Sequence, residues 1–254
     1  MRSFRNPAIE SLLALILLFV LWEMGVHISG VPSFILPAPS EVFEAMLPHM
    51  SVLWRHSMVT LGGTLLSLVL GAGLGMLAGL AIGYSPGVSR LLYPILGGLH
   101  ALPMSAFIPI FVVWFGTGMF PKVLAGLLIA FFPVTVNVVT GLRTIESELW
   151  EMLRTIGATR AQIFRKIGVP NTLPYFSASL KVAVAGAFIG NVVGEMIAAG
   201  SGLGYVLILS TNGMNMPLAF AALSILLLFG VALFTVFDTL ERFIAPWAFR
   251  KLTD

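Results

Sequence analysis

The side chains that most clearly indicate a functional site lie in a long apolar run in the last third of the chain. Glu195 follows Asn191 by one helical turn, and the glycine-rich stretch Gly200–Gly204 comes soon after it. A carboxylate within an apolar segment is costly, so we expect it to face other helices and to have a partner. Two roles are open for Glu195: a hydrogen-bonded anchor for the glycine-rich turn, or a group that lines or gates a pathway.

Reactive residues elsewhere in the chain do not form a catalytic set. Ser201 lies in the sequence AGSG, close to the Gly-x-Ser-Gly of rhomboid proteases, but no histidine follows His100 to act as its base. The chain has no cysteine, no HExxH and no GxxxxGK[ST] phosphate loop. His49 and His56 are seven residues apart with no third ligand nearby. We therefore expect no enzyme activity, no metal site and no cofactor in this chain.

The elements that position these residues are apolar helices. Hydrophobic residues make up 58% of the chain and charged residues 10%, and the mean hydropathy is +0.99; soluble domains have about 25% charged residues. A membrane span needs about 20 apolar residues. Six segments meet this criterion: 8–28, 58–83, 91–115, 122–142, 177–199 and 218–240. The first is longer than the apolar part of a signal peptide and lacks a cleavage site, so it is retained. The sequence predicts an all-α polytopic membrane protein with six transmembrane helices.

Basic residues are distributed unevenly between the two sides that six spans define. If the amino terminus is inside, only Arg55 and Lys122 lie outside. The inner basic residues are Arg2, Arg5, Arg90, Arg143, Arg154, Arg160, Arg165, Lys166, Lys181, Arg242, Arg250 and Lys251. Because basic residues concentrate on the cytoplasmic side, both termini and residues 143–176 are predicted to be cytoplasmic. The net charge of +3 follows from this bias and does not indicate a nucleic-acid partner.

The segment Glu148–Pro174 between two apolar runs is charged and has the signals of two short helices. An apolar stripe with spacings of three and four residues is typical of an amphipathic helix. Its members are Leu149, Met152, Leu153 and Ile156. Gly157 is placed to end that helix in the left-handed conformation. Thr159 and Gln162 have capping-box spacing for a second helix, which Pro170 is predicted to end. Such a helix pair between membrane spans is predicted to be a docking element.

This segment resembles the cytoplasmic EAA loop of binding-protein-dependent ABC importer permeases. The loop pattern is Glu-Ala-Ala, three residues, Gly, nine residues, Ile, one residue and Leu-Pro. The matching positions are Glu151-Met152-Leu153, Gly157, Ile167 and Val169-Pro170, with apolar residues in place of the alanines and the leucine. The likeness extends from about residue 36 to 240, through LPAPSEV, PIFVVWFGTG, FFPVTVNVVTGLR and GEMIAAGSGLGYVL. These stretches resemble the sulfonate, taurine and nitrate branch of the family.

The resemblance implies the MetI-like fold and a set of partners. The partners would be two cytoplasmic ATPase subunits, a periplasmic or tethered solute-binding protein and membrane lipid. A second copy of the same permease would complete a homodimer, because no second, different permease is implied. ATP would be used by the partner ATPase. The residues that would couple the chain to this ATPase are Glu151, Gly157, Ala158, Thr159, Gln162, Ile167 and Pro170.

Three parts of the chain are expected to have different roles. Residues 1–56 would form the first span and a periplasmic segment, 57–245 the core permease domain with the loop at about 143–176, and 246–254 a cytoplasmic tail. In the periplasmic segment, Ser40 can cap a helix with Glu41 in its first turn, which favours a short surface helix over a substrate contact.

Small residues repeat every four positions along two spans. The first set is Gly71, Gly75, Gly79 and Gly83, and the second is Gly186, Gly190 and Gly194. Such ridges let helices approach closely, so packing is the favoured interpretation and a gate sliding along one ridge is the alternative. The third and fourth predicted spans contain Pro94, Pro103, Pro109 and Pro133. These prolines indicate kinks or, with polar Asn137 nearby, a broken-helix wall of a pathway.

Together these features predict the permease subunit of an ABC importer in the bacterial inner membrane. The solute would be a small polar molecule of the sulfonate, taurine, nitrate or vitamin-precursor type, delivered by the binding protein. A secondary transporter is the alternative function. It would need an inverted repeat with matching intramembrane ion ligands, and the sequence offers neither. A passive channel or scaffold would not explain a capped cytoplasmic helix pair.

Overall fold

A computed structural model describes residues 7–100, 102–198 and 200–244. Over these residues the chain forms helices, turns and bends but no strands, which confirms the predicted all-α class. The α-helices are α1 (Pro7–Ser29), α2 (Pro39–Tyr84), α3 (Pro86–His100), α4 (Ile108–Phe115), α5 (Met119–Arg143), α6 (Ser147–Thr155), α7 (Arg160–Ile163), α8 (Val169–Ala198), α9 (Leu203–Asn212) and α10 (Met216–Ile244). A 3-10 helix, η1 (Met104–Phe107), precedes α4, and a π-helical turn, η2 (Phe164–Gly168), joins α7 to α8.

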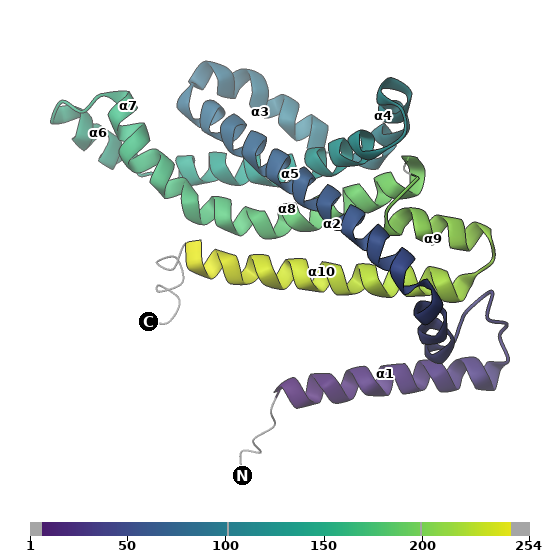
Figure 1. Ribbon diagram of the computed structural model, residues 1–254. Coiled ribbons are helices and arrows are strands. Elements are labelled where there is room, and N and C mark those ends of the chain that lie inside the picture. The colour runs from purple at the N-terminus through teal and green to yellow at the C-terminus, as the bar shows by residue number, and fades with distance from the viewer. Residues whose placement is uncertain (1–6, 101, 199, 245–254) are drawn as a thin grey trace, which may run out of the picture.

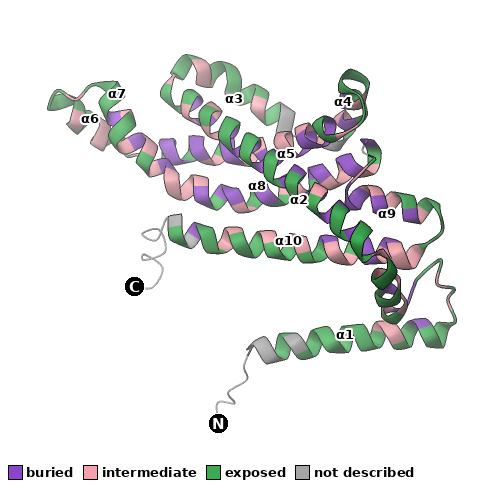
Figure 2. Ribbon diagram, in the orientation of Figure 1, coloured by how far each residue is buried: buried purple, intermediate pink, exposed green. Residues whose placement is uncertain are grey.

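Helix α5 is the centre of the bundle. It packs along α2 on one side and along α8 on the other, and α10 adds to α8 (Figure 1). Buried positions are concentrated on α5 and α8, whereas α1 and much of α10 are exposed (Figure 2). The shared core consists of Leu68, Ala72, Ala130, Val134, Val138, Leu180, Ala183, Val184 and Ala187. The alanines among them let the backbones of α2, α5 and α8 approach closely.

Within the described residues, four helices are long and apolar enough to cross a membrane. They are residues 39–84, 119–143, 160–198 and 216–241, and they contain four of the six predicted spans. Two shorter apolar helices are Leu13–Ser29, which overlaps the first predicted span, and Leu203–Asn212. The count of six spans stays a prediction. The start of α1 and the end of α10 lie at the same end of the bundle as α6 and α7 (Figure 1).

The predicted span 91–115 is divided among α3, η1 and α4. Pro103 has no amide hydrogen to donate and disfavours helical backbone at Leu102 before it, so the helix stops there. Pro109 lies in the first turn of α4, where its missing amide hydrogen costs nothing. Pro94 and Pro133 instead lie inside continuous helices. Two of the four prolines therefore accompany a break, and the other two are accommodated in α3 and α5.

The short surface helix predicted to start at Ser40 is wrong, because α2 runs from Pro39 to Tyr84 through Pro48. Ala38 is the residue before the first turn, and its amide donates to Glu41 Oε2 at 2.9 Å. Ser40 does not cap the helix; its amide and hydroxyl donate to the Glu23 carboxylate at 3.0 and 2.7 Å. A helical proline removes one hydrogen bond without ending a helix whose two flanks are stabilised by packing.

Candidate functional site

Helices α6 and α7 form the compact pair that the sequence predicts. Gly157, between them, has φ +88°, in the left-handed region. The amide of Gly157 donates to Arg154 O and that of Ala158 to Leu153 O, both at 3.0 Å, which closes the end of α6. Helix α7 begins with the predicted capping box: the Thr159 amide donates to Gln162 Oε1 at 2.8 Å, and the Gln162 amide donates to Thr159 Oγ1 at 3.3 Å.

The apolar stripe of α6 is uncovered. No residue of this helix is buried. Met152 is 56% exposed and Ile156, which directly follows the helix, is 74% exposed. Leu149 and Leu153 on the same stripe are partly buried. An amphipathic helix that leaves large apolar side chains in the open beside charged ones is typical of a surface that binds another protein.

The helix pair is attached to the end of α2. The Arg160 guanidinium donates to the Tyr84 carbonyl oxygen, and its central carbon lies 5.4 Å from the centre of the Tyr84 ring. The Phe164 ring meets the Tyr84 ring edge-on, with centroids 4.9 Å apart. A cleft of about 430 Å³ separates α6 from this contact and is lined partly by Trp150 and Glu151. The contact between the helix pair and α2 is therefore made by Arg160 and by Phe164 in the turn after α7.

The prediction that Pro170 ends the second helix is wrong. The chain continues from α7 through the π-helical turn η2 into α8, so that residues 160–198 form one helix. At the end of the turn the Val169 amide donates to Phe164 O, five residues earlier. This wider turn supplies the room that a proline ring needs near the start of α8. Ile167 is partly buried in the turn, and Gly168 is buried near the Leu142 side chain.

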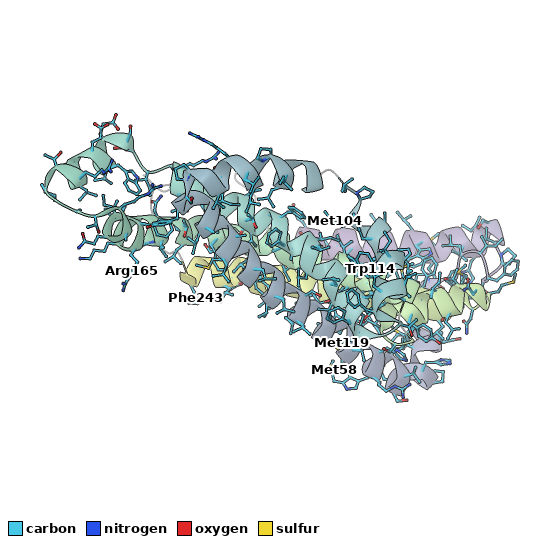
Figure 3. All side chains as sticks on the ribbon, turned by 90° about the horizontal axis from the view of Figure 1, so that it is seen from above. Met58, Met104, Trp114, Met119, Arg165 and Phe243 are labelled. Atoms are coloured by element: carbon cyan, nitrogen blue, oxygen red, sulfur yellow. The ribbon has the colours of Figure 1, made fainter. Side chains whose placement is uncertain are left out.

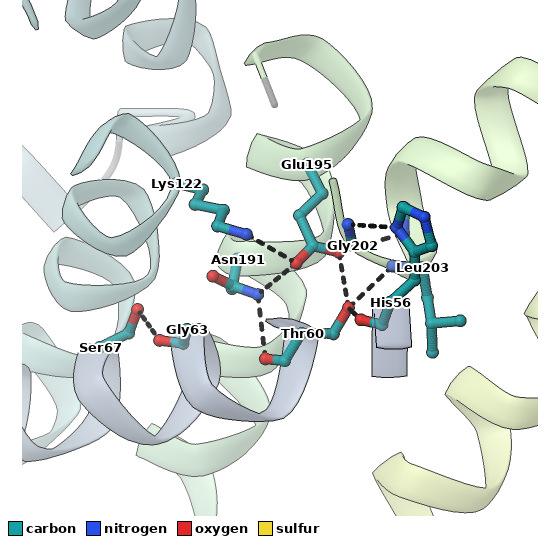
Figure 4. A network of polar contacts seen from close by, with 10 residues as sticks. His56, Thr60, Gly63, Ser67, Lys122, Asn191, Glu195, Gly202 and Leu203 are labelled. Atoms are coloured by element: carbon teal, nitrogen blue, oxygen red, sulfur yellow. Dashed lines mark hydrogen bonds and ion pairs between the residues drawn. The ribbon is translucent and has the colours of Figure 1, made fainter. Parts of the chain in front are cut away.

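At the opposite end of the bundle, Glu195 faces the interior and has a charged partner. Its side chain is fully buried, and Lys122, at the start of α5, is 1% exposed. Lys122 Nζ lies 3.1 Å from Glu195 Oε1, to which Asn191 Nδ2 also donates at 3.2 Å (Figure 4). Thr60 Oγ1 and the Gly204 amide donate to Oε2 at 2.8 and 3.1 Å. Both carboxylate oxygens are therefore fully occupied by protein donors.

The same network holds the glycine-rich turn against α2. The Leu203 amide donates to Thr60 Oγ1 at 2.8 Å, and the Gly202 amide donates to His56 Nδ1 at 2.9 Å (Figure 4). Gly202 has φ +108°, and a Cβ there would collide with the Glu195 carboxylate. The amides of Gly202, just before α9, and Leu203, its first residue, thus donate to side chains of α2. This geometry favours the anchoring role of Glu195.

Sequence reasoning missed Lys122, Thr60 and His56 as members of this network. A signal for Lys122 was present, since a carboxylate in an apolar span needs a cation and Lys122 opens the preceding apolar run. Asn137, which the sequence grouped with the pathway candidates, does not join them. It lies on α5 about 22 Å along the helix from Lys122, at a rise of about 1.5 Å per residue, and its Nδ2 donates to Pro133 O at 2.8 Å.

Both glycine ridges pack against α5. On α2, a Cβ added at Gly71 or Gly75 would lie 2.7 Å from the carbonyl oxygen of Leu127 or Phe131, respectively. On α8, a Cβ at Gly190 would lie 2.7 Å from the Gly126 Cα. Gly79 and Gly83 likewise approach Val138 and Leu142, and Gly186 and Gly194 approach Ile129 and Lys122. Only glycine allows this approach, so the geometry favours the packing interpretation of the ridges.

A helical membrane protein with a capped, exposed helix pair at one end of its bundle has the architecture of a transporter subunit that binds a separate protein. Residues 71–250 match the family described as binding-protein-dependent transport system inner membrane component, and the chain belongs to this family. A probable ABC transporter permease protein of Haemophilus influenzae is 35% identical over 93% of this chain and 97% of its own length. The resemblance to ABC importer permeases is therefore confirmed.

Relatives with named solutes cover the chain to a similar extent. The formylaminopyrimidine transport permease ThiX of Halalkalibacterium halodurans is 36% identical over 97% of this chain and 98% of its own length. The riboflavin permease RibX of Chloroflexus aurantiacus is 34% identical over 97% of this chain and 93% of its own. The fold is that of a chain in the inward-facing MetNI methionine ABC transporter, with a TM-score of 0.67 at 23% identity over 78% of this chain and 98% of that one. The chain is thus a multi-pass permease subunit of an ABC importer.

Proposed function

We propose that α6 and α7 are the surface through which this permease binds its cytoplasmic ATPase. The observation that carries the proposal is the uncovered apolar stripe at Met152 on α6 and at Ile156 directly after it, where the amides of Gly157 and Ala158 close the end of the helix. The residues proposed to couple the chain to the ATPase are Glu151, Gly157, Ala158, Thr159, Gln162, Ile167 and Pro170. Closure of the ATPase would push on this pair, and the continuous helix 160–198 would carry the movement into the bundle.

The orientation and the assembly are part of the same proposal. Basic residues occupy the elements at the end of the bundle that carries α6 and α7: Arg143 ends α5, Arg154 lies in α6, Arg160 begins α7 and Arg165 lies in η2 (Figure 3), which supports a cytoplasmic position. Both termini would then be cytoplasmic, and α9 would lie outside. The opposite end would receive the binding protein. A second copy of the chain in the lipid bilayer would complete the pathway, as a homodimer on two ATPase subunits.

We propose that the solute is a small polar molecule and that a vitamin-type heterocycle is favoured over a sulfonate. Relatives named for formylaminopyrimidine and riboflavin are 36% and 34% identical to this chain. Those named for aliphatic sulfonates and taurine are 28% and 26% identical. Because the binding protein selects the solute, the permease needs only a polar path wide enough for it.

Glu195 and Asn191 are proposed to hold the outer turn in place rather than to contact the solute. Both side chains are fully buried, and each oxygen of Glu195 already accepts two hydrogen bonds. A solute would have to displace these donors to reach the carboxylate. Asn137, which is partly buried on α5, stays a prediction as a pathway residue.

The experiment is solute uptake by proteoliposomes that contain the permease, its ATPase and its binding protein. Four labelled probes would be used: formylaminopyrimidine, riboflavin, taurine and an alkanesulfonate. We expect uptake of one heterocycle that requires ATP and the binding protein and that survives collapse of ion gradients by an ionophore. Uptake that is driven by an ion gradient without ATP would contradict the proposal and favour a secondary transporter.

A further inference from the structure

Three ionisable side chains that belong neither to the Glu195 network nor to α6 gather between α8 and α10. Lys181 Nζ lies 3.1 Å from Asp238 Oδ1, with hydrogen-bond geometry, and 2.6 Å from Glu241 Oε2 as an ion pair. Asp238 and Glu241 are three residues apart on α10, so they share one face of that helix. Lys181 comes from α8 and stands opposite both carboxylates.

The position of this cluster makes it costly. Lys181 and Asp238 fall inside the predicted spans 177–199 and 218–240, and Glu241 directly follows the latter. The side chains of Lys181 and Asp238 are 27% and 32% exposed, and that of Glu241 is 10% exposed. Ionisable groups within membrane-spanning segments carry a cost that pairing offsets, so a cluster of three is a candidate for a specific role. Packing alone would not require them, because apolar Leu180 and Phe237 already join α8 to α10 next to the cluster.

Helix α8 is the element that connects the docking surface with the outer network. The continuous helix 160–198 begins at Arg160, which contacts Tyr84, and ends three residues after Glu195. Lys181 lies about 32 Å along this helix from Arg160, at a rise of about 1.5 Å per residue. Among the described residues, the ion pairs between α8 and α10 are those of the Lys181 cluster.

We infer that Lys181, Asp238 and Glu241 are positioning residues that make α10 move together with α8 during the transport cycle. The inference rests on the proposed function of α6 and α7, since it concerns how a movement that starts there reaches α10. Two carboxylates on one face hold the lysine against displacement in either direction along the helix. The two ion pairs add fixed, directional links to the apolar contact between Leu180 and Phe237 that already joins these helices.

The test uses a triple variant, Lys181→Met with Asp238→Asn and Glu241→Gln, which leaves no unpaired charge in the membrane. Replacing a whole ion-pair group with neutral residues is often tolerated by the fold, whereas removing one partner is not. The full complex of permease, ATPase and binding protein would be assembled with labelled permease diluted in excess unlabelled permease, so that one copy carries nitroxides at cysteines replacing Val182 and Val236, which are 60% and 59% exposed. The distance between the labels would be measured with and without ATP.

In the native background we expect one narrow distance distribution that ATP leaves unchanged, because α8 and α10 move as a unit. In the triple variant the distribution should broaden on addition of ATP. ATP hydrolysis should stay within twofold of the native rate, while uptake of the probe that the native complex imports should fall at least tenfold. Lys181→Arg, which keeps the charge, should retain a narrow distribution and native uptake. The control Arg55→Met removes an exposed cation at the other end and should change nothing.

A triple variant with a narrow distribution and native uptake would overturn the inference. So would a triple variant that fails to assemble, because the cluster would then be needed for the fold. Failure of the proposed function has a different outcome: the ATPase would not bind the native permease, or ATP would not drive uptake by it. The distance measurement needs no knowledge of the solute.

Discussion

Glu195 and Lys122 form an ion pair that is shielded from both water and lipid, and the bonds around it explain why it is tolerated. Taking two charges into a bundle is offset only when their remaining donors and acceptors are satisfied. Thr60, Asn191 and the Gly204 amide fill the carboxylate's other positions. The pair therefore joins α2, α5 and α8 to the turn ahead of α9 at one point.

Neutralising one member of this pair should cost more than neutralising both. Glu195→Gln leaves Lys122 as a buried, unpaired cation, and breaking a buried pair in this way costs about 3–5 kcal/mol. We expect a marked fall in the thermal stability of the detergent-solubilised permease. The double variant Glu195→Gln with Lys122→Met should recover most of that loss. Glu44→Gln, on an exposed carboxylate of the same bundle end, is the control.

Two other results would count against anchoring. If Glu195→Gln is as stable as the native protein but transports poorly, its charge acts in the pathway. If the double variant is no more stable than the single one, the ion pair is not what holds the outer turn.

At Gly157 the backbone conformation, rather than contact with a neighbouring residue, requires glycine. No atom lies within 4 Å of an added Cβ, but φ is +88°. A β-branched residue in this region is strained by about 1 kcal/mol or more. Gly157→Val should therefore leave insertion and abundance normal while misaligning α6 and α7, so that ATPase binding weakens and transport is lost. Native transport by this variant would show that transport does not need the left-handed turn at Gly157.

At the scale of helices, α5 is enclosed by two glycine ridges. The ridges on α2 and α8 both meet the backbone of α5, so the three helices pack as one unit. In lipid the hydrophobic effect does not draw helices together, and close packing of small residues takes its place. Gly75→Leu or Gly190→Leu should force α5 away, lower the melting temperature by several degrees and reduce assembly. Gly73→Leu is the matched control, since nothing lies within 4 Å of a Cβ there. Equal stability of Gly73→Leu and Gly75→Leu would mean that the glycine ridge of α2 faces lipid rather than α5.

The parts of this structure that the sequence predicts are the ones set by local chemistry. Apolar length locates α2, α5, α8 and α10, and the capping box of Thr159 and Gln162 locates the start of α7. The parts it does not predict depend on distant partners. Ser40 has the composition of a cap but bonds to Glu23 instead. Pro170 does not end the helix, because the π-helical turn before it makes room for the proline ring.

The Glu195 network shows the same division. An intramembrane carboxylate predicts that a partner exists, but 73 residues separate Glu195 from Lys122. Which cation meets it depends on the packing of α5 against α8, which a single sequence does not contain. The Lys181 cluster was missed for a related reason: counted by sequence, Lys181 is one of many basic residues on the inner side.

For the whole molecule, the account requires that α6–α7 and the α9 end lie on opposite sides of the membrane. The chain has no cysteine, so single cysteines can report sidedness. Met214, 73% exposed after α9, should be labelled from outside intact cells by a membrane-impermeant maleimide when replaced by cysteine. Thr159→Cys, on the exposed turn, should be labelled only after the cells are opened. The reverse pattern would invert the topology.

The most direct test of the central claim is the affinity of the ATPase for the purified permease when the uncovered stripe of α6 is made polar. Met152→Asp and Ile156→Asp each place a charge where the account requires an apolar contact, and neither side chain is needed for the fold because both are exposed. We predict at least a tenfold loss of binding for each, with unchanged binding by Met214→Asp, an equally exposed position at the other end of the bundle. Native affinity in both α6 variants would contradict the account.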